Sequence, residues 1–155
     1  MPSLKLNWET WEDFWPEGQK MTQREYDEHS GWLDAKRPFK LDDKILEQEN
    51  SRGVFNIATA RVNGKLAGYC FWTLQTDIES EGLLIAIQGA LYVLPEALPC
   101  GVKLFKWCLG ELKASGIKFV YLHHPVYGRG VGLEKLFSRL GGRKTNVQYL
   151  LCLED

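Results

Sequence analysis

The sequence predicts a single α/β domain, residues 1–155, built on a mixed sheet of about six strands that is flanked by helices. Asn63-Gly64 separates two runs rich in β-branched residues, a pattern typical of a tight antiparallel hairpin. Residues 101–115 form an amphipathic stretch between two apolar runs, and this order predicts two parallel strands joined by a helix. A chain of 155 residues is long enough to bury a core without disulfides.

Residues 1–53 predict a helical front end that is acidic and rich in aromatic side chains. A short strand over residues 4–6 precedes a helix that begins at Thr10. Pro16-Glu17-Gly18 predicts the end of this helix, because proline and glycine break helices. Thr22-Gln23-Arg24-Glu25 is a capping box and opens a second helix.

Residues 54–155 predict the sheet core, with helices between the later strands. Further helices are expected at residues 41–52, 101–115 and 133–140. Strands are expected at residues 54–62, 65–75, 83–94, 117–123 and 147–153. The run 83–94 is nearly all apolar, interrupted by Gln88 and Gly89, which predicts a strand buried on both faces.

Composition and charge narrow the class of ligand. Residues 1–50 hold 12 acidic and 7 basic side chains, whereas residues 51–155 hold 8 acidic and 12 basic ones. The basic half favours an anionic ligand such as a phosphorylated cofactor, although ordinary solvated helix faces explain the same charges. The pI of about 6.3 argues against a dedicated nucleic-acid-binding role.

The four cysteines and the hydropathy pattern predict a reduced, non-membrane protein. The cysteines lack metal-site spacing, so neither a metal site nor a disulfide framework is expected. No apolar run reaches the length of a membrane-spanning helix, and no signal peptide is visible at the N-terminus. These features predict a cytoplasmic location.

Four motifs, in this order over about a hundred residues, resemble the GNAT N-acetyltransferase superfamily. They are Asn63-Gly64-Lys65-Leu66-Ala67-Gly68-Tyr69, Leu91-Tyr92-Val93-Leu94-Pro95-Glu96, Glu111-Leu112-Lys113-Ala114-Ser115-Gly116 and Leu133-Glu134-Lys135-Leu136-Phe137-Ser138-Arg139-Leu140-Gly141. The resemblance covers residues 40–142 well and residues 1–39 loosely. The overall order looks closest to small GNAT-like proteins encoded by tailed phages.

The resemblance implies that acetyl-CoA is the cosubstrate and that it enters a wedge between the two parallel strands. Its pantetheine is then expected to pair with strand backbone at Tyr92, Val93 and Leu94. Its pyrophosphate is expected at the start of the following helix, whose amides and dipole favour anions. The residues assigned to that part of the site are Leu98, Cys100, Gly101, Val102, Lys103 and Lys106.

The sequence departs from the family pattern in the cosubstrate loop and at one catalytic position. Leu98 stands where Arg or Gln is expected, and Pro99 supplies no amide donor. Lys103 replaces a small residue. Phe137 replaces the tyrosine that usually protonates the thiolate, and a phenyl ring has no proton to give.

Two other residues are candidates for the acid and base that an acyl transfer needs. Tyr127 is the nearest tyrosine able to replace the missing acid, and His123, at the end of the strand beside the wedge, is a candidate base. A polar strand cap for His123 and a packing role for Tyr127 are the simpler interpretations. Residues 127–132 form a second glycine loop, which is an alternative pyrophosphate site or a loop that meets an anion through Arg129.

Three functions remain open at this stage. The first is an N-acetyltransferase that acts on an unidentified amine of a protein or small molecule. The second is a catalytically degenerate GNAT-like protein that acts as a phage virion-associated or host-binding protein. The third is an inhibitor that presents the acidic, tryptophan-rich front end to a host partner. Phage origin would place the chain in the host cytoplasm or in the virion.

Overall fold

The structure is a computed structural model that describes residues 1–29, 39–124, 132–149 and 151–153. The chain divides into two compact units. The first contains Met1–Thr22 and Leu41–His123, and it holds the whole sheet. The second contains Gln23–Lys40 and His124–Asp155.

The first unit is built on a five-stranded mixed sheet with the order β1-β2-β3-β4-β5. Its strands are β1 (Leu4–Glu9), β2 (Phe55–Val62), β3 (Lys65–Thr76), β4 (Leu84–Val93) and β5 (Phe119–Tyr121). Neighbouring strands are antiparallel from β1 to β4, whereas β4 and β5 are parallel. The predicted hairpin and the predicted parallel pair are both confirmed.

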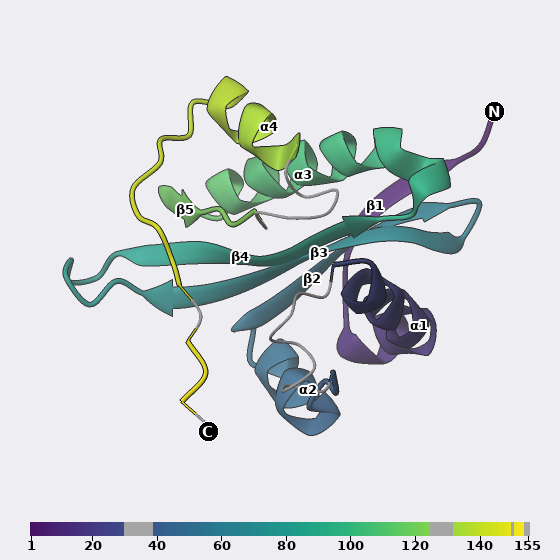
Figure 1. Cartoon of the computed structure of the whole chain (residues 1–155), viewed down its shortest axis with the longest axis horizontal. Helices are drawn as coiled ribbons and strands as arrows, with labels where there is room; N and C mark the ends of the chain where they lie inside the picture. Colours follow the sequence, from purple (N-terminus) through teal and green to yellow (C-terminus); the bar gives the residue numbers. More distant parts are fainter. Residues whose placement is uncertain (30–38, 125–131, 150, 154–155) are drawn as a thin grey trace. The chain divides into compact units, whose positions relative to one another are not determined.

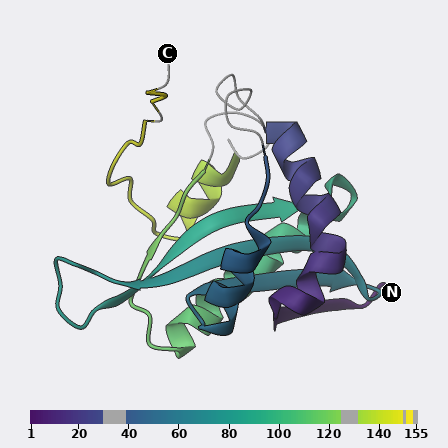
Figure 2. The same cartoon turned by 90° about the horizontal axis from the view of Figure 1, so that it is seen from below.

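Helices cover both faces of this sheet. The helix α3 (Leu98–Ala114) lies on one face, and α2 (Asp43–Ser51) and the first turns of α1 (Trp11–His29) lie on the other (Figures 1 and 2). Asp42 caps α2, as its side chain accepts the Ile45 N–H, and α2 ends where the sequence predicts. The mixed α/β architecture follows the predicted fold class.

The turn between β2 and β3 has the geometry that Asn-Gly favours. Val62 pairs with Lys65, and the two residues between them have positive φ angles, 51° at Asn63 and 81° at Gly64. Two positive φ angles define the type I′ turn, whose twist matches that of the flanking strands. The local sequence therefore determines the geometry of this turn.

The two faces of the sheet carry different side chains, because residues alternate along each strand. On the α1 side a buried cluster contains Trp11, Phe14, Met21, Phe55, Ile57, Leu66, Tyr69 and Tyr92. On the other side α3 buries Leu104, Phe105, Cys108 and Leu112. There the ring of Trp72 stacks on Phe105 with centroids 6.0 Å apart.

The predicted break at Pro16-Glu17-Gly18 is wrong, and so is the separate helix predicted to open at Thr22. One helix, α1, runs through both positions to His29. A Cβ on Gly18 would lie 2.4 Å from the Phe14 ring, so glycine here makes room for a buried side chain. Burial of Phe14 and Met21, at roughly 2 kcal/mol each, offsets the roughly 3 kcal/mol that an interior proline costs.

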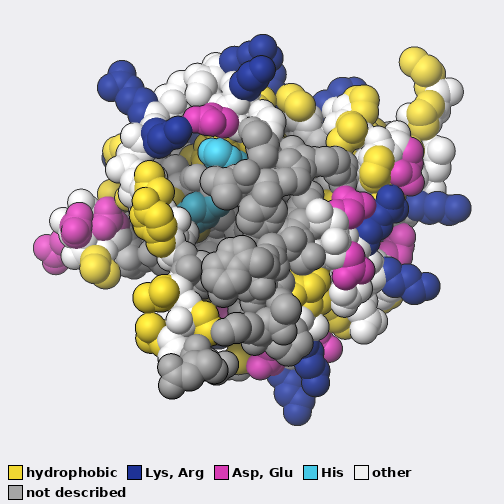
Figure 3. Space-filling view, in the orientation of Figure 1, with side chains coloured by type: hydrophobic (Ala, Val, Ile, Leu, Met, Phe, Trp, Pro, Cys, Tyr) yellow, Lys and Arg dark blue, Asp and Glu magenta, His cyan; other side chains and the backbone are white. Residues whose placement is uncertain are grey.

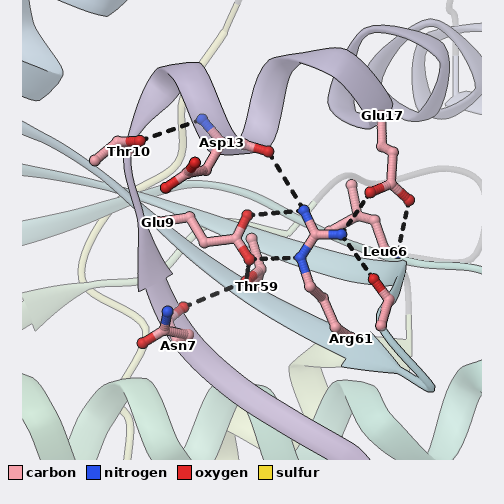
Figure 4. Close-up of polar contacts among 9 residues, drawn as sticks. Asn7, Glu9, Thr10, Asp13, Glu17, Thr59, Arg61 and Leu66 are labelled. Carbon is pink, nitrogen blue, oxygen red and sulfur yellow. Dashed lines mark hydrogen bonds and ion pairs between the residues drawn. The ribbon is translucent and has the colours of Figure 1, made fainter.

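An ion-pair network joins β1, α1 and the β2–β3 hairpin (Figure 4). Arg61 donates from Nε to Glu9 Oε1 over 2.6 Å and from Nη2 to Glu9 Oε2 over 3.0 Å. Arg61 Nη1 donates to Glu17, whose other oxygen accepts the Leu66 N–H over 2.9 Å. Two acidic residues of the front end are thus engaged within the first unit.

Two further expectations need correction. The helix expected to begin near Gly101 begins at Leu98, directly after a 3₁₀ turn over Pro95–Ala97. The strand expected at 147–153 does not form in the described part of that segment, so the sheet has five strands rather than about six. In the second unit α4 (Leu133–Arg139) forms as predicted.

That the whole chain forms a single domain stays a prediction.

Candidate functional site

The parallel ladder between β4 and β5 is short. It contains the pairs Ile85↔Phe119, Ala86↔Val120 and Ile87↔Tyr121, whereas β4 continues to Val93. Just past the last pair, the buried Gln88 contacts His123 through two hydrogen bonds. This is the point at which the resemblance places the opening of the cosubstrate wedge.

His123 lies two residues beyond the end of β5 and is exposed. Histidine side chains reach the surface on the face shown in Figure 3. The His123 imidazole is therefore accessible from solvent. The structure therefore places His123 where the sequence analysis expected it, next to the end of the parallel pair.

A β-bulge shifts the register of β4 within the site. Trp72 pairs with Gln88 and Phe71 pairs with Ala90, which leaves Gly89 as the extra residue. The bulge reverses which face alternate residues occupy. Tyr92 consequently packs beside Tyr69 in the α1-side cluster, with ring centroids 6.0 Å apart.

The three residues expected at the pantetheine position have different backbone roles. The Leu94 N–H donates to the Ala67 carbonyl of β3 over 2.9 Å, and the Leu94 carbonyl accepts the Ala97 N–H over 2.8 Å. Tyr92 pairs with Tyr69 on the same side. Since backbone groups alternate along a strand, Val93 directs its own toward the β5 side of β4. Of the three, Val93 is the residue whose backbone groups point away from β3.

The start of α3 offers fewer amides than an ordinary helix start. Four N–H groups lie ahead of the first helical hydrogen bond, here those of Ala97, Leu98, residue 99 and Cys100. The Ala97 N–H donates to Leu94, and Pro99 has none. At most two amides therefore remain for an anion.

The remaining candidates line the first turns of α3. Gly101 packs against β4, where a Cβ would lie 3.0 Å from Val93 Cγ2. Cys100 is half-buried, and Leu98 and Val102 are exposed. Lys103 and Lys106 are also exposed. The residues fit a pyrophosphate through two lysine charges and up to two amides, which is a weaker set of donors than the family pattern implies.

Two catalytic expectations involve the segment that follows β5. Tyr127 and Arg129 lie outside the described residues, as does most of the second glycine loop. Phe137 occupies α4 in the second unit, where it is buried at 8% exposure and lies 6.3 Å from His124 between ring centroids. The position where the family resemblance expects a tyrosine is therefore a buried position of α4.

Sequence reasoning missed the contact that Gln88 makes with His123. The signal was present, since Gln88 is a polar residue inside an otherwise apolar run. It is 2% exposed, and a buried amide is costly unless it is hydrogen-bonded. A polar side chain retained at such a position indicates a specific partner.

The described residues hold neither a cluster of metal ligands nor a membrane-spanning helix. Within them, His, Cys, Asp and Glu side chains form no group of three or more suited to a metal ion. No helix there has the length and apolar character needed to cross a bilayer.

The fold was compared with known proteins. No family model matches the sequence, and no curated protein matches it. Solved structures do match. An aminoglycoside acetyltransferase from an uncultured soil metagenomic sample, solved with sisomicin, is 16% identical, with a TM-score of 0.70 and 97% of both chains covered.

Two other matches have comparable coverage. A ribosomal-protein-alanine N-acetyltransferase from Brucella melitensis is 16% identical, with a TM-score of 0.72 over 98% of this chain and 100% of that one. A predicted acetyltransferase from Clostridium acetobutylicum, solved with acetyl-CoA, is 12% identical, with a TM-score of 0.69 over 97% of both chains. The chain therefore has the fold of the GNAT N-acetyltransferases.

Proposed function

We propose that the chain is an acetyl-CoA-dependent N-acetyltransferase that acts on an unidentified amine of a protein or small molecule. The observation that carries the proposal is the position of His123. An exposed imidazole lies just beyond the short parallel ladder of β4 and β5, in a fold shared with acetyltransferases. The basic side chains of α3 support an anionic cosubstrate.

The reaction requires one proton to leave the amine and one to reach the sulfur. The amine nitrogen attacks the acetyl carbonyl carbon, so that a C–N bond forms and the C–S bond breaks. His123 accepts the amine proton, and the bonding electron pair leaves with sulfur as the CoA thiolate. The thiolate then takes a proton from Tyr127 or from water.

The cosubstrate is proposed to lie along β4 and the start of α3. Val93 faces the pantetheine, and its neighbours Tyr92 and Leu94 hold this part of β4 against β3. Lys103 and Lys106 neutralise the phosphates. Leu98, Cys100, Gly101 and Val102 form the adjoining turn. The proposed location is the cytoplasm, which is the host cytoplasm if the chain is phage-encoded.

A calorimetric titration of the full chain with acetyl-CoA tests the proposal first. CoA release against a panel of amines and lysine peptides then tests turnover. Saturable binding with CoA release that depends on an added amine is the expected result. A chain that neither binds acetyl-CoA nor releases CoA with any amine contradicts the proposal.

A second function is favoured by the same helix start. The Ala97 amide is used internally, Pro99 lacks one, and Leu98 brings no charge. These features suit a GNAT-like protein that has lost catalysis and acts as a host-binding or virion-associated protein. Failure of both assays above in a correctly folded chain is the outcome that this alternative predicts.

A further inference from the structure

Gln88 and His123 are joined at the position where the β4–β5 ladder ends. Extending the register Ile87↔Tyr121 by one bond would bring the His123 N–H to the Gln88 carbonyl. The structure does not make this backbone bond. The His123 N–H instead donates to Gln88 Oε1 over 3.1 Å, and His123 Nδ1 lies 2.9 Å from the Gln88 carbonyl oxygen.

Two hydrogen bonds that involve the side chains of Gln88 and His123 thus replace the one backbone hydrogen bond. The side-chain oxygen of Gln88 accepts the His123 N–H, and the His123 ring bonds to the Gln88 carbonyl oxygen. In a continued ladder this N–H and this carbonyl would bond to each other. The reciprocal contact, which we call the Gln88–His123 clasp, therefore ends the parallel ladder at this residue.

The clasp also determines which ring nitrogen of His123 carries the proton. A carbonyl oxygen only accepts hydrogen bonds, so Nδ1 must be the donor to Gln88. In the neutral imidazole the other nitrogen, Nε2, then holds the lone pair. Nε2 has no hydrogen-bond partner among the described residues, and the side chain is exposed.

We propose that Gln88 is a positioning residue that holds His123 in the Nδ1–H tautomer and leaves Nε2 as the proton acceptor. The inference rests on the proposed function, in which His123 takes the amine proton. In this proposal Gln88 acts through His123 and not directly on the substrate. Its side chain anchors the His123 backbone, and that anchor keeps the ring against the Gln88 carbonyl.

The clasp is tested on the full chain by nitrogen-15 NMR of the His123 ring at a pH where the ring is neutral. The native chain is expected to show a protonated Nδ1 and an unprotonated Nε2. Gln88→Met removes the amide acceptor at similar volume, and it should convert this spectrum to a mixture of tautomers. Gln88→Glu keeps an oxygen acceptor for the His123 N–H and should restore the native spectrum.

Kinetics of CoA release give a second readout. Gln88→Met is expected to lower kcat about tenfold, because the base is misplaced. KM for acetyl-CoA should change less than twofold, because the contacts with the cosubstrate are unchanged. Gln75→Met, at an exposed position of β3, is the matched control and should leave kcat unchanged. Thermal unfolding of each variant identifies losses that arise from misfolding.

The outcomes separate this inference from the proposed function. A native His123 that carries its proton on Nε2 overturns the clasp, whatever the activity. A Gln88→Met spectrum and kcat equal to the native ones overturn the role of Gln88. Absence of turnover in a native chain with the Nδ1–H signature overturns the proposed function instead, because the NMR signature does not depend on turnover.

Discussion

Gly18 lies against the ring of Phe14 one turn earlier in α1, so closely that an added Cβ would come within 2.4 Å of two ring carbons. The Phe14 ring is completely buried and has little freedom to move. We expect Gly18→Ala to lower the free energy of unfolding by about 2 kcal/mol, because overpacking outweighs the better helix propensity of alanine. Denaturant unfolding measures the change.

Gly110 is the matched control, since it lies inside α3 with nothing within 4 Å of an added Cβ. Gly110→Ala should raise the free energy of unfolding by about 0.5 kcal/mol, through helix propensity and reduced freedom of the unfolded chain. Equal effects of the two substitutions would contradict the packing explanation for Gly18.

Arg61 neutralises Glu9, whose side chain is only 7% exposed. We expect Arg61→Met to lower the free energy of unfolding by about 3 kcal/mol, because it leaves a buried carboxylate without its cation. The double variant Glu9→Gln/Arg61→Met should recover part of this loss. Arg52→Met removes an exposed pair with Glu49 and should cost less than about 0.5 kcal/mol.

Glu17 makes stability depend on pH. Burial raises the pKa of Glu17, but the hydrogen bond from the Leu66 N–H and the Arg61 guanidinium outweigh it and hold the pKa below its ordinary value of 4.5. A carboxyl with a depressed folded pKa stabilises the fold above its unfolded pKa, and this contribution is lost as pH falls through the folded value.

Native protein and Glu17→Gln should therefore differ most at neutral pH. Because the Glu17 side chain is 47% exposed and screened by solvent, we expect a difference of about 1 kcal/mol in the free energy of unfolding. The difference should shrink as pH is lowered below 4.5. A difference that stays constant or grows on acidification contradicts the assignment.

Local signals in the sequence predicted those parts of the fold that local geometry determines. Asn63-Gly64 has the two positive φ angles that its hairpin needs, and the strand–helix–strand order gave the parallel pair β4–β5. The predicted helix break at Pro16-Glu17-Gly18 was wrong, because the role of Gly18 depends on its contact with Phe14 in a tertiary cluster. Such contacts cannot be identified from a dipeptide pattern.

The strand predicted for the C-terminal segment was wrong for a different reason. Val147, Tyr149, Leu151 and Leu153 alternate like a strand, yet all four are exposed and the described part of the segment forms no strand. Alternation alone does not make a strand, which also needs a neighbouring edge to pair with. The clasp was equally hidden, because the pairing of Gln88 with His123 depends on the register of β4 and β5.

Lys103 and Lys106 test the proposed position of the CoA phosphates. Replacing both by alanine should weaken acetyl-CoA binding about tenfold at low ionic strength and less at physiological salt, where exposed charges are screened within about 8 Å. Isothermal titration at two salt concentrations measures this. Lys113 and Lys118 are exposed residues at and just after the C-terminal end of α3, and their double alanine variant should bind normally.

Phe137 tests whether thiolate protonation limits the proposed reaction. The ring is buried in α4 at the position where the family resemblance expects a tyrosine acid. A positioned acid contributes about 10²–10⁴-fold to rate, so a chain without one should turn over slowly. We expect Phe137→Tyr to raise the rate of CoA release at least about tenfold, with only a small loss of stability from the added hydroxyl.

Two companion substitutions, each measured in the native and the Phe137→Tyr background, identify which group supplies or accepts each proton. If Tyr127 is the native acid, Tyr127→Phe lowers the rate in the native background but has little effect once Phe137→Tyr supplies a second acid. His123→Ala lowers the rate in both backgrounds, because the amine must still be deprotonated. Tyr127→Phe and His123→Ala variants that match the native rate contradict both assignments and leave water as the donor and acceptor. A rate that Phe137→Tyr does not raise shows that this residue does not face the sulfur.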